Sequence, residues 1–349
     1  MAGKVRFGII GTGVGANFCA NGIALIANSG IAELTAVTSR REERAKEFAS
    51  KWGVKQWYTD YRRMLMEAPI DAVIISTPHY QHYPMALDAI EAGKHVLIDK
   101  PMAINLKEAD EIIREAERKG VKLGVNFQSR FDPTFRKVKE AAEDGVFGRL
   151  ILGEAVVEWF RTQEYYDGSP WRGRWSTEGG GALINQAIHT IDLLLWIMGP
   201  PKYLWAQMGT FAHRIEVEDL AAATIRFENG AIGIIQGSTA IYPGLPTRLE
   251  IHGTRGTAII EGENLKRWSV IDGEDIVSEG VKEGLKSWAK PELVPATNHA
   301  ALIKDFAEAI LEDRKPFVDG VEGRKSLEVI MAIYKSGRTN NIVSFPLSN

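Results

Sequence analysis

The sequence has almost no cysteine, no long apolar run and no strong excess of charge of one sign. Cys19 is the only cysteine among 349 residues, which excludes an intrachain disulfide and favours a reducing compartment. No stretch approaches the ~20 apolar residues that a membrane helix needs. The formal net charge of -3 gives no reason to expect nucleic acid or an anionic membrane as partner. The first residues enter a strand pattern without a signal peptide, so we expect a cytoplasmic protein.

The first third of the chain alternates short apolar runs with amphipathic segments. Runs typical of buried strands span Val5 to Ile10, Ala32 to Thr38, Ala72 to Ser76, Val96 to Ile98 and Leu123 to Val125. Segments with helical spacing of apolar residues span Glu42 to Lys51, Pro84 to Ala92 and Leu106 to Lys119. Strand and helix repeated in this way predict an α/β domain over residues 1–125, with a parallel sheet and right-handed crossovers.

The rest of the chain, residues 126–349, has a different pattern. Strand-like runs span Leu150 to Trp159, Tyr203 to Phe211, Ala221 to Phe227, Ala231 to Ser238, Thr247 to His252 and Thr257 to Glu261. Asn229-Gly230 joins two of these runs as a tight hairpin turn would. Helices are expected at Ala182 to Met198, about His299 to Glu312 and about Gly323 to Lys335. We therefore expect an α+β domain with a large, predominantly antiparallel open sheet.

A glycine-rich turn separates the first strand from a helical segment. Its residues are Gly11, Thr12, Gly13, Val14, Gly15 and Ala16, which match the dinucleotide fingerprint in its G-x-G-x-x-A form. Gly11 permits the tight turn, and Gly13 lets the backbone approach a pyrophosphate. The N-terminus of the following helix offers free N–H groups and its dipole to the phosphates. This position predicts a Rossmann dinucleotide-binding domain.

The end of the second strand indicates which dinucleotide is preferred. An NAD-specific site would place Asp or Glu there to bind the ribose 2′-hydroxyl. This sequence instead has Thr38, Ser39, Arg40 and Arg41. A hydroxyl and guanidinium groups suit a 2′-phosphate, because Arg grips phosphate through paired charge-assisted bonds. Ser39 and Arg40 therefore favour NADP. NAD is the alternative if the two arginines are only solvated or if Arg40 stacks on adenine.

Asp99-Lys100-Pro101 follows the run Val96 to Ile98, at the edge where open α/β sheets bind ligands. This tripeptide resembles the Glu-Lys-Pro hallmark of the Gfo/Idh/MocA family of oxidoreductases, with the shorter carboxylate of Asp99. The resemblance covers nearly the whole chain. Its other parts are the glycine fingerprint, residues 77–82, Arg130-Phe131, Gly179-Gly180-Gly181 and the stretch from Val318 to Ser336. It implies that residues 126–349 bind the substrate and form the oligomer.

The resemblance implies three residues in the chemistry. Lys100 is expected near the nicotinamide, where a desolvated lysine can hold the alkoxide-like oxygen or relay its proton. Asn185 and His189 are four residues apart and share a helix face. His189 is expected to be the acid/base. Family members commonly carry Asp in the place of Asn185, which cannot hold a negative charge and is expected to hydrogen-bond the substrate. The glycines before this helix are expected to allow close approach of nicotinamide or substrate.

The loops after the strands are expected to supply further cofactor contacts. The resemblance places residues 77–82 beside the nicotinamide ribose, with His82 as a contact, and Gln128 on the nicotinamide side. The expected cofactor-binding set is Gly11, Thr12, Gly13, Val14, Gly15, Ser39, Arg40, Ser76, Thr77, Pro78, His82, Asp99, Lys100 and Gln128. His79 and His82 are three residues apart, but no Cys, His or acidic cluster completes a ligand set, so no metal is expected.

The segment from Glu158 to Trp175 is dense in aromatic residues and arginine. Aromatic faces stack on the C–H surface of sugars, and Arg binds hydroxyls, phosphates or carboxylates. The candidate substrate-binding residues are Arg161, Tyr165, Tyr166, Trp171, Arg172 and Trp175. The same residue types are enriched at subunit interfaces, which is the alternative interpretation. Something must cover the open sheet, and the resemblance implies a homodimer or homotetramer formed through it.

These features predict an NAD(P)-dependent oxidoreductase that transfers a hydride between nicotinamide and a hydroxyl or carbonyl. The substrate is expected to be a sugar, sugar nucleotide or cyclic polyol. Two alternatives stay open. An NAD-dependent glycoside hydrolase with transient oxidation would use the same Lys100 and His189. A non-catalytic dinucleotide-binding sensor would need neither residue, so their presence argues against it.

Overall fold

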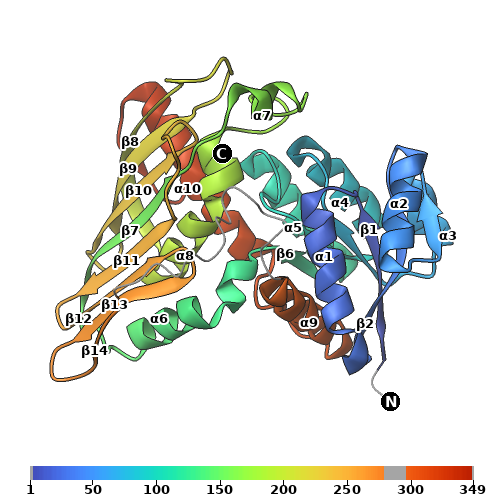
Figure 1. Ribbon diagram of the computed structural model, residues 1–349, viewed down its shortest axis with the longest axis horizontal. Helices are drawn as coiled ribbons and strands as arrows, with labels where there is room; N and C mark the ends of the chain where they lie inside the picture. Colours follow the sequence, from blue (N-terminus) through green and yellow to red (C-terminus); the bar gives the residue numbers. More distant parts are fainter. Residues whose placement is uncertain (1–2, 279–295, 348–349) are drawn as a thin grey trace. The chain divides into compact units, whose positions relative to one another are not determined.

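A computed structural model gives the structure of residues 3–278 and 296–347 (Figure 1). The chain divides into two compact units. Unit 1 comprises Met1–Phe131 and Val294–Arg324, and unit 2 comprises Asp132–Leu293 and Lys325–Asn349. The sequence was expected to divide once, after residue 125. The structure differs because a segment from late in the chain completes unit 1.

Unit 1 is built on a parallel sheet with the strand order β3-β2-β1-β4-β5-β6. Its strands are β1 (Val5–Ile10), β2 (Ala32–Thr38), β3 (Gln56–Tyr58), β4 (Ala72–Ile75), β5 (His95–Ile98) and β6 (Leu123–Val125). This is the Rossmann order, whose switch point lies between β1 and β4. The predicted parallel sheet is confirmed. The short strand β3 was not predicted, because none of its three residues is fully buried and the run carries no apolar pattern.

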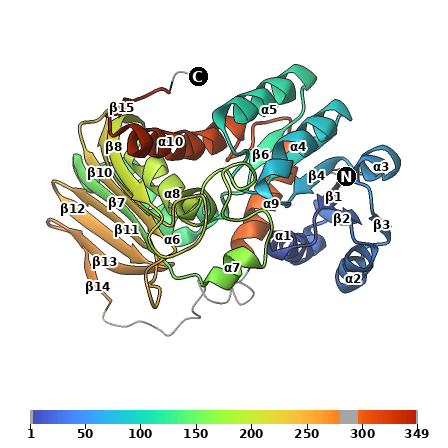
Figure 2. The same cartoon turned by 90° about the horizontal axis from the view of Figure 1, so that it is seen from above.

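Helices cover both faces of this sheet (Figure 2). One face carries α1 (Val14–Leu25), α2 (Glu42–Trp52) and α9 (Thr297–Leu311). The other carries α3 (Tyr61–Glu67), α4 (His82–Glu91) and α5 (Leu106–Lys119). Phe306 of α9 packs against Phe7 of β1, with ring centroids 6.4 Å apart, and both side chains are fully buried. This packing is why α9 belongs to unit 1 although it comes after the second sheet in the sequence.

Unit 2 is built on a sheet with the strand order β14-β13-β12-β11-β7-β10-β9-β8-β15. Its strands are β7 (Leu150–Glu158), β8 (Pro201–Gly209), β9 (Leu220–Phe227), β10 (Ile232–Ser238), β11 (Arg248–Gly253), β12 (Gly256–Glu261), β13 (Asn264–Val270), β14 (Asp275–Val277) and β15 (Val343–Ser344). The pairs are antiparallel except β7 with β10, which is parallel. The turn at Asn229-Gly230 connects β9 to β10, and Gly230 has a φ of +85°. The predicted antiparallel sheet and hairpin are confirmed.

The helices of unit 2 gather on one face of its sheet (Figures 1 and 2). They are α6 (Pro133–Glu143), α7 (Gln163–Asp167), α8 (Ile188–Met198) and the part of α10 (Gly320–Thr339) from Lys325 onward. The segment predicted as one helix from Ala182 to Met198 begins as a π-helix, Ala182–Ala187, and continues as α8. Single π-helical turns inside longer helices are frequent at functional sites.

Candidate functional site

The three glycines of the turn after β1 differ in why glycine is needed at each position. Gly11 has a φ of +115°, and a Cβ there would lie 2.1 Å from the carbonyl oxygen of Ser76. A Cβ at Gly15 would lie 2.3 Å from Asp99 Oδ2. The fold itself therefore requires both glycines. At Gly13, the N-cap of α1, a Cβ would meet no described atom within 4 Å. This open approach to the N-terminus of α1 fits the pyrophosphate of a dinucleotide.

Asp99 organises the carboxyl edge of the parallel sheet. Its Oδ2 accepts a hydrogen bond from the Ser76 hydroxyl (3.0 Å), and its Oδ1 accepts from the backbone N–H of Lys100 (2.9 Å). Asn126 Nδ2, after β6, donates to the same Oδ1 at 3.3 Å. The side chain of Asp99 thus connects the ends of three neighbouring strands and fixes the backbone of Lys100. Lys100 is partly buried and is followed by a cis peptide to Pro101.

His82, which was predicted to contact the nicotinamide ribose, is the first residue of α4. Its side chain is buried, with Nδ1 2.7 Å from the carbonyl oxygen of Pro101 and Nε2 2.8 Å from that of Thr77. Burial lowers the pKa of His82, while the two carbonyls and Asp99 act in the opposite direction. Both ring nitrogens face backbone carbonyls, so His82 holds the loop after β4 against the Lys100-Pro101 segment. Its contact with a ribose stays a prediction.

Two other predicted cofactor positions have open polar groups. Gln128 lies in the turn Gln128–Phe131, and its Oε1 is buried without a hydrogen-bond partner among the described residues. Ser39 and Arg40 follow β2, where Arg40 is exposed. The Ser39 hydroxyl accepts a bond from the backbone N–H of Arg41 at 3.4 Å. The carbonyl of Gln128 can accept a bond from a carboxamide, and the Ser39–Arg40 pair can meet an anionic group.

In unit 2, the glycines before the π-helix make room for protein atoms. A Cβ at Gly180 would lie 2.1 Å from the hydroxyl of Tyr334, and one at Gly181 would lie 2.0 Å from the backbone oxygen of Glu218. The buried Glu218 carboxylate accepts bonds from the N–H groups of Gly181 (2.8 Å) and Leu183 (2.9 Å). It also accepts from the Tyr334 hydroxyl at 2.8 Å. The fold therefore requires both glycines for packing, and the approach of nicotinamide or substrate to them stays a prediction.

Asn185 and His189 are partly exposed, whereas Ala187 and Ile188 between them are buried. Both side chains therefore lie on the less buried side of this helical segment. Asn185 Nδ2 donates to Glu178 Oε1 at 2.5 Å. Burial raises the pKa of Glu178 to about 7, although it also accepts a bond from the N–H of Gly173. A carboxylate is therefore present beside position 185 after all. The sequence signal for it was an acidic residue directly before three glycines.

The predicted substrate-binding residues separate into two groups. Arg161, Tyr165 and Arg172 form a cluster, in which the Arg172 guanidinium lies 4.0 Å and that of Arg161 5.4 Å from the Tyr165 ring centroid. The Tyr165 hydroxyl accepts a bond from Gln186 Nε2 at 2.8 Å, which links this cluster to the helical segment. Trp171 also lies beside Arg172, with the guanidinium 5.3 Å from its ring.

Tyr166 and Trp175 form contacts inside unit 2 instead. The buried Tyr166 shares a 2.7 Å hydrogen bond with the Thr239 hydroxyl. Trp175 packs edge-on against Tyr334, with ring centroids 5.1 Å apart, and its indole N–H donates to the backbone oxygen of Glu216. These contacts hold the loop in place, and a contact of either residue with the substrate stays a prediction.

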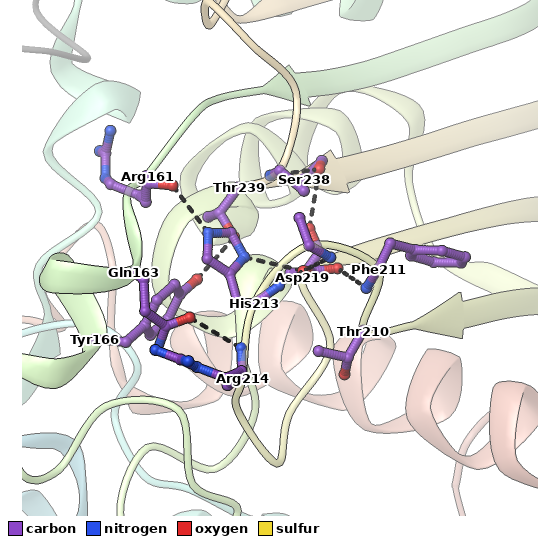
Figure 3. Close-up of polar contacts among 12 residues, drawn as sticks. Arg161, Gln163, Tyr166, Thr210, Phe211, His213, Arg214, Asp219, Ser238 and Thr239 are labelled. Carbon is purple, nitrogen blue, oxygen red and sulfur yellow. Dashed lines mark hydrogen bonds and ion pairs between the residues drawn. The ribbon is translucent and has the colours of Figure 1, made fainter.

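A buried pair that the sequence did not predict holds the base of the same loop (Figure 3). The Asp219 carboxylate accepts backbone N–H bonds from Phe211 (2.8 Å), Ala212 (2.9 Å) and His213 (3.1 Å). His213 Nδ1 lies 2.9 Å from Asp219 Oδ2, and Nε2 lies 2.8 Å from the backbone oxygen of Arg161. The pair therefore fixes the backbone at Arg161.

Within the part of the chain that the structure describes, no three or more His, Cys, Asp or Glu side chains are grouped so that they could hold a metal ion. None of the helices in that part is both long enough and apolar enough to cross a membrane.

A Rossmann sheet with an open glycine turn defines a dinucleotide-binding protein. The chain belongs to the Gfo/Idh/MocA oxidoreductase family. Residues 5–127 match the model "Oxidoreductase family, NAD-binding Rossmann fold", and residues 135–259 match the model "GFO/IDH/MocA C-terminal domain". The resemblance inferred from the motifs is thereby confirmed.

Individual relatives cover nearly the whole chain. Myo-inositol 2-dehydrogenase of Thermotoga maritima is 26% identical over 340 residues, which are 95% of this chain and 96% of the relative. The structure of WlbA dehydrogenase from Bordetella pertussis, in complex with NADH and UDP-GlcNAcA, is 31% identical with a TM-score of 0.87, covering 99% of this chain and 100% of the other. Levoglucosan dehydrogenase, at 22% identity and a TM-score of 0.88 over 99% and 100% of the two chains, shares the fold.

Proposed function

We propose that this protein is an NAD(P)-dependent dehydrogenase or reductase of a sugar, sugar nucleotide or cyclic polyol. The observation that carries the proposal is that one chain combines two features. Unit 1 has an open dinucleotide-binding turn and the Asp99-Lys100-Pro101 motif, and unit 2 has a polar helix face formed by Asn185 and His189. Relatives named for an inositol and crystallised with a sugar nucleotide support this substrate class.

Residues of unit 1 fit the dinucleotide. The backbone at Gly13 and the N-terminus of α1 would hold the pyrophosphate. Gln128 Oε1, an acceptor without a donor among the described residues, would take a bond from the carboxamide of the nicotinamide. Ser39 and the exposed Arg40 favour a 2′-phosphate, so we propose NADP in preference to NAD. When bound, the nicotinamide supplies the hydride acceptor or donor.

The chain's own side chains would manage the proton and orient the sugar. Lys100, whose backbone is fixed by Asp99, would hold the substrate oxygen as its proton leaves. His189 would accept or return that proton. Asn185, held by Glu178, would bind an adjacent hydroxyl. The Tyr165 ring with its two arginines would bind the rest of the sugar.

The experiment is a panel of sugars, cyclic polyols and sugar nucleotides, each mixed with the purified chain and either NADP⁺ or NAD⁺. Absorbance of reduced nicotinamide reports net oxidation, and chromatography of the sugars reports glycoside cleavage. Stoichiometric formation of reduced nicotinamide and oxidised sugar is the expected result. Release of free sugar from a glycoside without net reduction would favour a cofactor-retaining glycoside hydrolase. Tight dinucleotide binding with no turnover of any panel member would favour a sensor.

We also propose that the chain forms a homodimer or homotetramer through the outer face of the unit 2 sheet. No described helix lies on that face (Figure 2). Large apolar side chains on β8 and β10 are exposed there: Trp205 is 43%, Ile232 42% and Ile234 36% exposed. Exposed apolar patches of this kind mark protein interfaces. Sedimentation equilibrium is expected to give a dimer or tetramer for the wild type and smaller species for Trp205→Glu. A wild-type monomer would contradict this proposal.

A further inference from the structure

A hollow of about 490 Å³ lies within unit 2, and three arginines line it. We call it the arginine cavity and define it by Arg172, Arg174 and Arg214, with Tyr166 and Ile215 among its other walls. Two stretches of chain form it, residues 166–174 around the end of α7 and residues 214–216 before β9. A cavity of this size is in the range of small-molecule sites.

The two stretches are fixed to one another, so the cavity is built by the fold. The backbone N–H of Glu216 donates to the carbonyl of Gly173 at 2.8 Å. The backbone N–H of Arg214 donates to the side-chain oxygen of Gln163 at 2.9 Å (Figure 3). Gly173 has a φ of +75°, and a Cβ there would lie 2.8 Å from Ile215 Cγ2. The backbone around the arginines is thereby held without using their guanidinium groups.

Among the residues that the structure describes, the arginines of the cavity are not paired with individual acidic side chains. Within the described part of the chain, none of its three arginines forms an ion pair. The guanidinium of Arg172 donates to a backbone oxygen of Tyr165 at 3.3 Å and stacks on that ring, and its Nε has no hydrogen-bond partner among the described residues. Asp167 and Glu216 also line the cavity, but Asp167 accepts a bond from Gln163 and both are exposed. Donor capacity therefore exceeds the acceptors that the protein supplies.

The arginine cavity shares a residue with the cluster of Arg161, Tyr165 and Arg172. Arg172 lies in both, because its guanidinium is 4.0 Å from the ring centroid of Tyr165. The Tyr165 hydroxyl is bonded to Gln186, the neighbour of Asn185 on the helical segment. A ligand held by the arginines would thus have its uncharged part directed along Tyr165 toward that segment.

We propose that the arginine cavity binds an anionic group of the substrate, a carboxylate or a phosphate, so that the substrate is an acidic or phosphorylated sugar. This inference rests on the proposed function for the sugar, but the anion site itself does not depend on turnover. Guanidinium groups bind both carboxylate and phosphate through paired charge-assisted bonds. Arg174 and Arg214 would then determine the specificity for an anionic over a neutral sugar.

The test is calorimetric titration of the full chain saturated with dinucleotide, so that the phosphate site of unit 1 is filled. The probes are D-glucose, D-glucuronate and D-glucose 6-phosphate, which differ in the group attached to one carbon. At least one anionic probe is expected to bind roughly tenfold or more tightly than glucose, a difference of about 1.4 kcal/mol. Its affinity is expected to fall with added salt.

The double variant Arg174→Gln/Arg214→Gln is expected to lose the preference for the anionic probe over glucose. Because both side chains are exposed, their replacement leaves the core of unit 2 undisturbed. Arg255→Gln, a change at an exposed arginine of the same unit outside the cavity, is the matched control. The anionic probe whose affinity falls most in the double variant shows whether the cavity prefers a carboxylate or a phosphate. Equal binding of glucose and both anionic probes, or a preference that survives in the double variant, would overturn the anion site. Anion binding without turnover of any panel sugar would instead overturn the proposed function alone.

Discussion

Replacing Gly13 by alanine separates cofactor binding from folding, because only this glycine of the turn has open space beside it. Its backbone lies at φ −77° and ψ −166°, which alanine also adopts, and the added Cβ would touch no described atom within 4 Å. Alanine reduces the entropy of the unfolded chain, which stabilises by about 0.4–1 kcal/mol. Alanine is also the weaker N-cap by a similar amount. We therefore expect the free energy of unfolding to change by less than about 1 kcal/mol.

Dinucleotide binding by Gly13→Ala is expected to weaken strongly. The new methyl group stands where the pyrophosphate must approach the N-terminus of α1. A hydrogen bond to a charged group contributes about 1.5–3 kcal/mol, so the loss of one raises Kd by roughly tenfold to hundredfold. Gly11→Ala is the contrasting variant. With a φ of +115° and a Cβ 2.1 Å from the Ser76 oxygen, it is expected to lower the free energy of unfolding by about 2 kcal/mol or more.

Quenching of tryptophan fluorescence by NADPH and NADH measures Kd, and urea unfolding measures stability. We expect Gly13→Ala to keep the wild-type unfolding curve and to lose affinity for both dinucleotides. If Gly13→Ala bound both dinucleotides with the wild-type Kd, the turn after β1 would not hold the pyrophosphate.

The remaining predictions concern buried groups. The pKa of Glu178 is raised to about 7 from an ordinary 4.5. Its contribution to the free energy of unfolding is therefore present below about pH 4.5 and lost as pH rises through 7. In urea unfolding, Glu178→Gln should remove about 3 kcal/mol of this pH-dependent loss of stability. Burial lowers the pKa of His299 to about 4, so its contribution is present above about pH 6.5 and lost as pH falls toward 4. His299→Phe, which can keep the stacking on Phe18, should remove about 3 kcal/mol of this acid loss, and an unchanged acid limb would refute the assignment. His82→Ala should lower the free energy of unfolding by about 2–4 kcal/mol, because it removes a buried ring between two carbonyls; a change under about 1 kcal/mol would contradict its role.

Much of unit 1 was predictable because its pattern is local. Continuous apolar runs gave β1, β2 and β6 with their observed bounds, and Gly120 marked the end of α5. The position of α9 was not predictable, because it depends on a contact between Phe306 and Phe7, which are far apart in the sequence. No local pattern reports which sheet a late helix will cover.

The candidate site shows the same limit. The motifs identified Lys100 and His189 as candidates, but they did not indicate which neighbours the predicted residues contact. Gly180 and Gly181 are required by Tyr334 and Glu218, which are distant in sequence. His82 lies between two carbonyls that belong to separate loops. A sequence motif names the residue type at a position, whereas hydrogen-bond partners are fixed only by the fold.

The central proposal is that Lys100 holds the substrate oxygen as the hydroxyl loses its proton during hydride transfer. The most direct measurement is single-turnover formation of reduced nicotinamide, with a sugar substrate identified in the panel, for the wild type and Lys100→Met. Loss of a group that stabilises the charge developing on a reacting oxygen costs roughly 10²–10³-fold in rate. We expect a loss of that size in Lys100→Met, with the Kd for dinucleotide unchanged. A Lys100→Met protein that reduces nicotinamide at the wild-type rate would contradict it.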